Sequence, residues 1–210
     1  MAHDQQNTRS GQQIPAQPGS RPPAADTAGR GGEPKEAARP ERTGRPIVDS
    51  RAARAVFAAV RLAIGWIFLW AFLDKLFGLG FATPAEGAWI SGGSPTEGYL
   101  TDATSGPLAG FYASFAGAAW ADVLFMAGLL GIGLALLLGI GVRIAAATGA
   151  LLLVLMWTAV LPPENNPFMD DHLVQALVLV GLALVNAGDT WGLGRRWSSL
   201  GLVRRFPVLR

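Results

Sequence analysis

The chain of 210 residues contains no cysteine and only two histidines. The lack of cysteine excludes disulfides, iron–sulfur ligation and thiolate metal sites within this chain. Only His172 lies near an apolar segment, which excludes a bis-histidine haem between membrane helices. We therefore expect no covalently bound cofactor and no metal site. A redox cofactor would have to be a diffusible molecule or belong to a partner subunit.

Charged residues are also scarce, at 15% of the chain against roughly a quarter in a soluble domain. No Lys or Arg occurs between Leu76 and Val142 or between Ile144 and Gly194. Apolar runs of about 18 residues or more with so few charges are typical of transmembrane helices. The composition predicts an integral membrane protein in contact with lipid, with no nucleic acid among its partners.

The apolar runs predict an all-α fold, a four-transmembrane-helix bundle within a membrane domain of residues 48–197. We expect the spans at about 55–77, 122–141, 144–161 and 171–187. A structureless loop as long as residues 78–119 is uncommon, so this first outer loop is expected to contain short interfacial helices, over Pro84–Ser91 and Pro107–Ala116. Small residues recur every fourth position in the second span and predict a ridge for close helix packing, at Ala127, Gly131, Ala135 and Gly139.

Basic residues indicate how the chain is oriented. Residues 1–47 lack large apolar side chains and predict a disordered tail, and residues 198–210 predict a basic, partly amphipathic tail. Four spans put both tails and the Arg143 turn on one side, with every basic residue except Lys75. By the positive-inside rule, both termini are expected to be cytoplasmic. Arg61, inside the first span, is expected to extend back to the headgroups.

A polar stretch, Leu161–His172, separates the third and fourth spans. On the fourth helix Gln175 lies one turn below His172, and polar side chains of a membrane helix face the bundle or a partner. Asp74 shares a face of the first helix with Trp66 and Trp70. Asp74 and Lys75 end the first helix on the outer side, where the fourth helix begins. This arrangement predicts an ion pair of Lys75 with Asp170 or Asp171.

Two interpretations of these polar residues stay open. In the first they form a quinone pocket, with His172, Asp74 and Lys75 as candidate catalytic residues and Asp171, Gln175 and Asn165 as candidate ligand-binding residues. His172 would protonate or donate to a quinone carbonyl, a task suited to a pKa near ambient pH. In the second, Asp171 caps the fourth helix, Asn165 helps to close a turn, and His172 lies among the headgroups.

Over residues 55–197 the chain resembles the DoxX family of small bacterial membrane proteins. The resemblance is carried by Arg61–Phe77 with its terminal Asp-Lys, the glycine-rich second span, the Leu161–His172 stretch and Thr190–Gly194. It implies a four-helix bundle in the bacterial cytoplasmic membrane. It also implies kinship with the membrane subunit of thiosulfate:quinone oxidoreductases. The expected function is quinone-linked electron transfer related to thiosulfate, sulfur or oxidative stress, by analogy with the family.

Other classes of function stay open as well. The chain could be a non-catalytic membrane anchor for soluble redox enzymes, which the missing cysteines and the tails favour. A small transporter is a weaker alternative, because the chain shows no paired repeat. A partner protein subunit or a homo-oligomer is expected, and whether the chain is itself an enzyme is left open.

Overall fold

The computed structural model describes residues 48–164 and 166–210. The predicted tail of residues 1–47 and the candidate residue Asn165 lie outside the described residues. The described part is built from helices and contains no strand, as the apolar patterning predicted. These described residues belong to one compact unit.

The four longest helices follow the four apolar runs. They are α1 (Arg51–Phe77), α3 (Ala119–Leu138), α4 (Val142–Ala159) and α5 (Asp171–Leu184). Three of them, α1, α3 and α4, are long and apolar enough to cross a membrane. The 14 residues of α5 extend only about 21 Å at 1.5 Å per residue, less than a hydrocarbon core of about 30 Å. The predicted span 171–187 is too long because Asn186 takes a left-handed conformation, with φ 51°, just past the helix.

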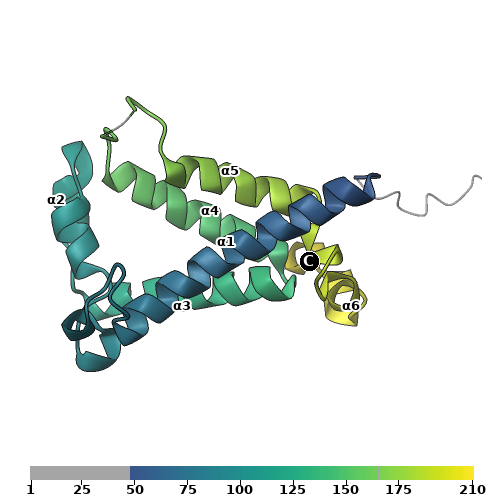
Figure 1. Cartoon of the computed structure of the whole chain (residues 1–210), viewed down its shortest axis with the longest axis horizontal. Coiled ribbons are helices and arrows are strands. Elements are labelled where there is room, and N and C mark those ends of the chain that lie inside the picture. Colours follow the sequence, from purple (N-terminus) through teal and green to yellow (C-terminus); the bar gives the residue numbers. More distant parts are fainter. Residues whose placement is uncertain (1–47, 165) are drawn as a thin grey trace, which may run out of the picture. The chain divides into compact units, whose positions relative to one another are not determined.

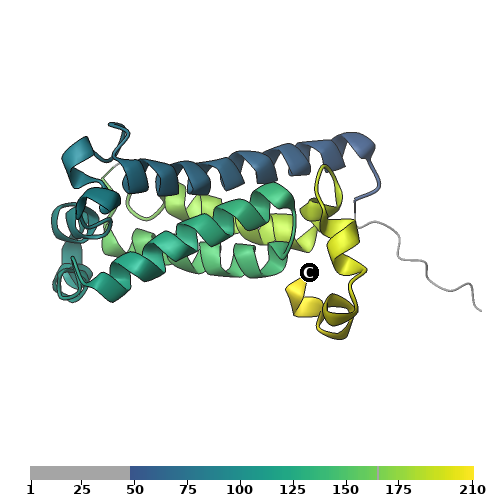
Figure 2. The same cartoon turned by 90° about the horizontal axis from the view of Figure 1, so that it is seen from below.

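Each long helix packs against the next long helix in the sequence: α1 against α3, α3 against α4, and α4 against α5 (Figure 1). A quarter turn of the view shows α1 lying along one side of the other long helices (Figure 2). The core between them includes Ile64 and Phe68 from α1, Met126 from α3, Leu153 from α4 and Leu179 from α5. Leu179 belongs to the face of α5 that carries His172 and Gln175, so this face is directed inward as expected.

Two glycines set the close approach of α1 and α3. A Cβ added to Gly133 would lie 2.8 Å from the backbone nitrogen of Leu69, and one added to Gly65 would lie 2.9 Å from Cβ of Leu136. The predicted ridge is therefore wrong at Gly131, where an added Cβ would meet nothing within 4 Å. Because α3 is apolar on every side, its sequence did not show which face packs.

Arg61 does not extend to the headgroups, as the sequence had suggested. Its side chain is completely buried, with 0% exposed. One terminal nitrogen, Nη1, donates to the carbonyl oxygens of Leu136 and Leu137 in the last turn of α3. The other, Nη2, donates to the carbonyls of Thr190 at 3.3 Å and Trp191 at 3.0 Å. The cation thus donates to carbonyls at the C-terminal end of α3, where the helix dipole is negative.

The connection between α1 and α3 contains short helices, as expected, with different bounds. They are η1 (Ala85–Gly87), η2 (Trp89–Ser91), η3 (Tyr99–Ala103), η4 (Gly106–Leu108) and α2 (Ala109–Ala113). Together with residues 160–164 and 166–170 they lie at one end of the long helices, which we call the loop end (Figure 1).

A buried carboxylate fastens this connection to α3. Asp122, only 6% exposed, accepts hydrogen bonds through Oδ1 from Ser94 Oγ at 2.8 Å, Thr96 N at 3.0 Å and Thr96 Oγ1 at 2.6 Å. A carboxylate with several donors is a strong local anchor, because hydrogen bonds to charged groups are stronger than neutral ones.

Replacing Asp122 with alanine should loosen the connection while leaving the long helices in place. The three lost hydrogen bonds leave the buried hydroxyl and amide of Thr96 and the half-buried hydroxyl of Ser94 without this acceptor, each at a cost of about 1 kcal/mol. Limited proteolysis should then cut within residues 79–118 several times faster. The matched control is Glu86→Ala, an exposed acid of the same connection, which should be cut at the wild-type rate. Equal rates in the two variants would rule out the anchor.

The opposite end of the long helices holds residues 186–210, and we call it the basic end. Here η5 (Ala187–Asp189), α6 (Gly194–Ser198), α7 (Gly201–Arg205) and η6 (Pro207–Leu209) fold back onto the turn between α3 and α4. The backbone nitrogen of Arg143 donates to the Arg210 carbonyl at 2.9 Å, and Trp197 Nε1 donates to the Leu209 carbonyl at 2.6 Å. Residues 198–210, expected as a tail, are thus folded against the helix ends.

Candidate functional site

A pocket lies along the outer face of α1, next to the loop that follows it. Trp66, Trp70 and Asp74 are four residues apart, so they project from one face of the helix. The pocket has a volume of about 410 Å³. It is lined by Trp66, Ile67, Trp70, Ala71, Asp74, Lys75, Phe81 and Ala82. The predicted common face of Asp74 and the two tryptophans is confirmed.

The walls of this pocket, which we call the α1 pocket, are aromatic. The ring centroids of Trp66 and Trp70 are 5.8 Å apart, and Phe81 meets Trp70 edge-on at 5.1 Å and 83°. Trp66 is 51% and Phe81 76% exposed, so the pocket opens on the outside of the helix. Apolar aromatic walls with a few polar groups at one end are typical of small-molecule sites.

The polar end of the pocket consists of Asp74 and Lys75. Asp74 is 2% exposed, and its carboxylate accepts from the backbone nitrogens of Phe81 at 3.2 Å and Ala82 at 3.0 Å. It therefore holds the loop that closes the pocket. Lys75 is half-buried beside it. Its ammonium group carries three donors and can reach a carbonyl or an anionic oxygen of a bound molecule.

A second polar cluster lies at the start of α5. Asp170 caps this helix by accepting from Leu173 N at 3.0 Å, and its other oxygen contacts His172 Nδ1 at 2.6 Å. The expected cap at Asp171 is wrong by one residue, and Asp171 is exposed. The contact with Asp170 orients the imidazole and leaves Nε2 to face other partners.

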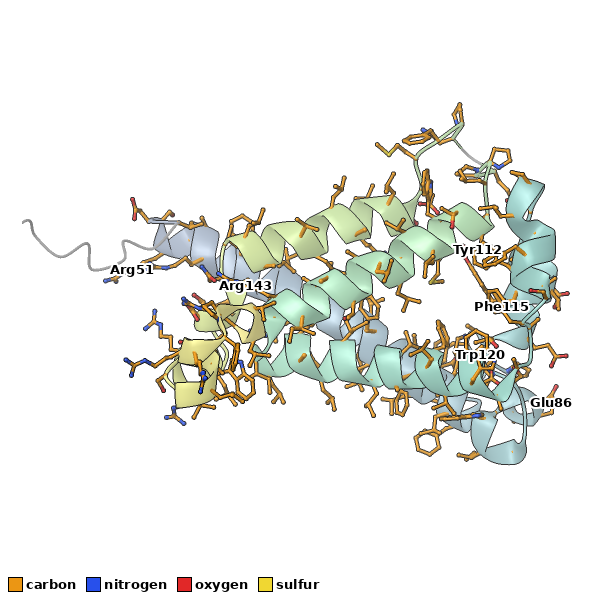
Figure 3. All side chains as sticks on the ribbon, turned by 180° about the vertical axis from the view of Figure 1, so that it is seen from behind. Arg51, Glu86, Tyr112, Phe115, Trp120 and Arg143 are labelled. Atoms are coloured by element: carbon orange, nitrogen blue, oxygen red, sulfur yellow. The ribbon has the colours of Figure 1, made fainter. Side chains whose placement is uncertain are left out.

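Tyr99 lies near Asp170 of this second cluster, and Tyr112 lies near Tyr99; neither tyrosine was among the predicted site residues. Tyr99 OH donates to the Met156 carbonyl at 3.2 Å, and burial, the negative charge of Asp170 and Tyr112 raise the pKa of Tyr99 to about 12. Tyr112 OH donates to the Leu155 carbonyl at 3.1 Å and is 2.6 Å from Thr158 Oγ1. Figure 3 shows Tyr112 and Phe115 reaching from the connection towards the long helices. Both tyrosines thus hold the end of α4.

The predicted site residues are divided between these two places. The end of α1 and the start of α5 lie at separate corners of the loop end (Figure 1). The expected ion pair of Lys75 with Asp170 or Asp171 is wrong, since the ion pairs of the described residues join His172 to Asp170 and Arg210 to Asp189. Gln175 is half-buried near His172, one turn further along α5. Within residues 48–164 and 166–210, no group of three His, Asp or Glu side chains could hold a metal ion.

Comparison of the chain with family models, curated proteins and solved structures found no match. Function has therefore to be inferred from the residues and their geometry.

Proposed function

We propose that this chain is a multi-pass subunit of the bacterial cytoplasmic membrane that binds a quinone in the α1 pocket and takes part in quinone-linked electron transfer. The observation that carries the proposal is the aromatic pocket on an apolar helix with Lys75 and Asp74 at one end. The resemblance to the DoxX family favours the same function and suggests thiosulfate, sulfur or an oxidative-stress product as the source of electrons.

The chemistry of the pocket suits a flat, apolar ring with carbonyl oxygens. The ring of a quinone can lie against Trp66 and Trp70, whose faces favour stacked or edge-on aromatic contacts. The Lys75 ammonium can donate to one carbonyl, and Asp74 keeps the loop with Phe81 closed over it. Because the pocket opens on the outside of α1, a lipid-soluble molecule can enter from the bilayer. A bound quinone would supply the electron-accepting chemistry.

The arrangement in the membrane is part of the proposal. In it, α5 completes a four-helix bundle with α1, α3 and α4, and the segments on either side of α5 lie in the headgroup regions. The basic end, with Arg51 and Arg143, would face the cytoplasm and the loop end, with Glu86, would face outward (Figure 3). Electrons would come from a partner subunit, since the chain has no cysteine to hold a redox centre.

Replacing Lys75 with glutamine should weaken quinone binding about tenfold, because a charged donor to the carbonyl is lost. Binding can be measured on the full-length chain in lipid nanodiscs, from quenching of tryptophan fluorescence by decylubiquinone. Trp66→Leu should weaken binding as well, because Trp66 lines the pocket. Its matched control is Trp120→Leu, which removes another exposed tryptophan, outside the pocket, and should leave the affinity unchanged.

His172→Ala decides between the two clusters. It should leave decylubiquinone binding unchanged, because His172 lies at the start of α5 and not in the α1 pocket. Loss of binding in His172→Ala, with Lys75→Gln unaffected, would contradict the proposal and move the quinone to the second cluster.

One observation favours a second candidate, the non-catalytic anchor for soluble redox enzymes. The carboxylates of Asp74, Asp122 and Asp170 each accept hydrogen bonds from backbone nitrogens, so these acids act as local structural anchors. An anchor would bind no decylubiquinone in a saturable way. It would retain a soluble redox enzyme on purification from native membrane, equally in wild type, Lys75→Gln and His172→Ala.

A further inference from the structure

The C-terminal segment, residues 191–210, carries an unbalanced positive charge. It contains five arginines and no acidic residue. Arg210 pairs with Asp189 at 2.8 Å, whereas the other four are exposed, and among the described residues no carboxylate pairs with them. These four are Arg195, Arg196, Arg204 and Arg205.

Large apolar side chains are exposed on the same segment. Trp191 is 62%, Leu202 64% and Val208 65% exposed, and Leu193, Leu200 and Phe206 are also exposed. A surface that combines exposed aromatic and aliphatic side chains with arginines and lacks acids is typical of segments that lie on an anionic bilayer.

The segment is held at the depth where the long helices end. Arg143 Nη1 donates to the Pro207 carbonyl at 3.1 Å, Trp197 Nε1 donates to that of Leu209, and Val203 is buried at 3% exposed. The N-terminal turn of α1, with Arg51, lies at the same end (Figure 3). A helix that crosses a bilayer has its ends among the headgroups, so this folded segment lies at the depth of the lipid phosphates.

We propose that the folded segment of residues 191–210 is a binding surface for anionic phospholipid headgroups. The guanidinium groups of its four unpaired arginines can bind phosphate oxygens in a bidentate manner. Its exposed apolar side chains then lie in the upper part of the acyl chains, in the manner of an interfacial helix. This inference requires the chain to lie in a membrane and is independent of quinone binding.

The test counts the lipids that remain on the full-length chain. Purified from nanodiscs of equal phosphatidylglycerol and phosphatidylcholine, the wild type should retain phosphatidylglycerol in roughly threefold excess or more by native mass spectrometry. The variant with Arg195→Gln, Arg196→Gln, Arg204→Gln and Arg205→Gln should lose this excess. Its helical content and melting temperature check that the fold is kept. If the fold is lost, the pair Arg204→Gln and Arg205→Gln alone should lower the excess.

A matched control separates a local surface from net charge. Adding Glu86→Lys and Glu97→Lys to the fourfold variant restores the net charge at the loop end, on exposed residues. Retention of phosphatidylglycerol should stay low in this variant. The proposal is overturned if the fourfold variant retains as much phosphatidylglycerol as the wild type, or if the two lysines restore it. Quinone affinity measured on the same variants should be unchanged, whichever way the lipid result falls.

Discussion

Replacing Arg61 with alanine should lower the free energy of unfolding by about 3–5 kcal/mol. The side chain is completely buried and donates to carbonyls of Leu136, Leu137, Thr190 and Trp191. Its removal takes a charged donor from the Leu136 and Leu137 carbonyls at the end of α3 and leaves a cavity between α1, α3 and the turn at residues 190–191.

The measurement is reversible unfolding in mixed detergent at fixed lipid content. Arg51→Ala is the matched control, since it removes the same side chain from the exposed first turn of the same helix and should change stability by about 0.5 kcal/mol or less. The stability of Arg61→Lys should lie between the stabilities of the two alanine variants. The three donors of one ammonium group cannot reach carbonyls on two separate segments as a guanidinium does. Equal stabilities of the two alanine variants would contradict the role of Arg61.

Replacing Gly133 with alanine should destabilise the protein by about 1–3 kcal/mol, although the change adds only one methyl group. The added Cβ would lie 2.8 Å from the backbone nitrogen of Leu69 and 3.1 Å from its Cα. Backbone atoms cannot rotate away, so α1 and α3 must separate, and the packing between them is lost.

Gly131→Ala offers a control two residues away on the same helix. Its Cβ would meet nothing within 4 Å, so the substitution should leave stability unchanged or raise it by up to about 1 kcal/mol through helix propensity. Both variants can be compared in one unfolding series. A destabilisation at Gly131 as large as that at Gly133 would contradict the arrangement of α1 and α3.

The sequence predicted the helices well because long apolar runs are a strong signal. Predicted starts and ends differ from those observed by a few residues for α1, α3 and α4. The end of α5 could not be predicted from the apolar run, because this run continues through Val185 while Asn186 turns the backbone out of the helix. The packing face of α3 could not be predicted for a different reason: small residues occur on several sides of a helix that is apolar all round.

The candidate site was predicted in part. The common face of Trp66, Trp70 and Asp74 follows from helical spacing alone, and the pocket confirms it. Phe81 could not be placed, because it comes from a glycine-rich loop whose path depends on hydrogen bonds to Asp74. The predicted pairing of Lys75 with the start of α5 is wrong because two helix ends at the same end of the molecule need not be in contact.

Photolabelling tests the proposed function most directly. The full-length chain in lipid nanodiscs is illuminated with an azido-quinone probe, with and without excess decylubiquinone, and the labelled peptides are mapped by mass spectrometry. We expect labelling within residues 66–82, lost in the presence of decylubiquinone and weakened by Lys75→Gln. Labelling that decylubiquinone does not reduce, or that falls at the start of α5, would contradict a quinone site in the α1 pocket.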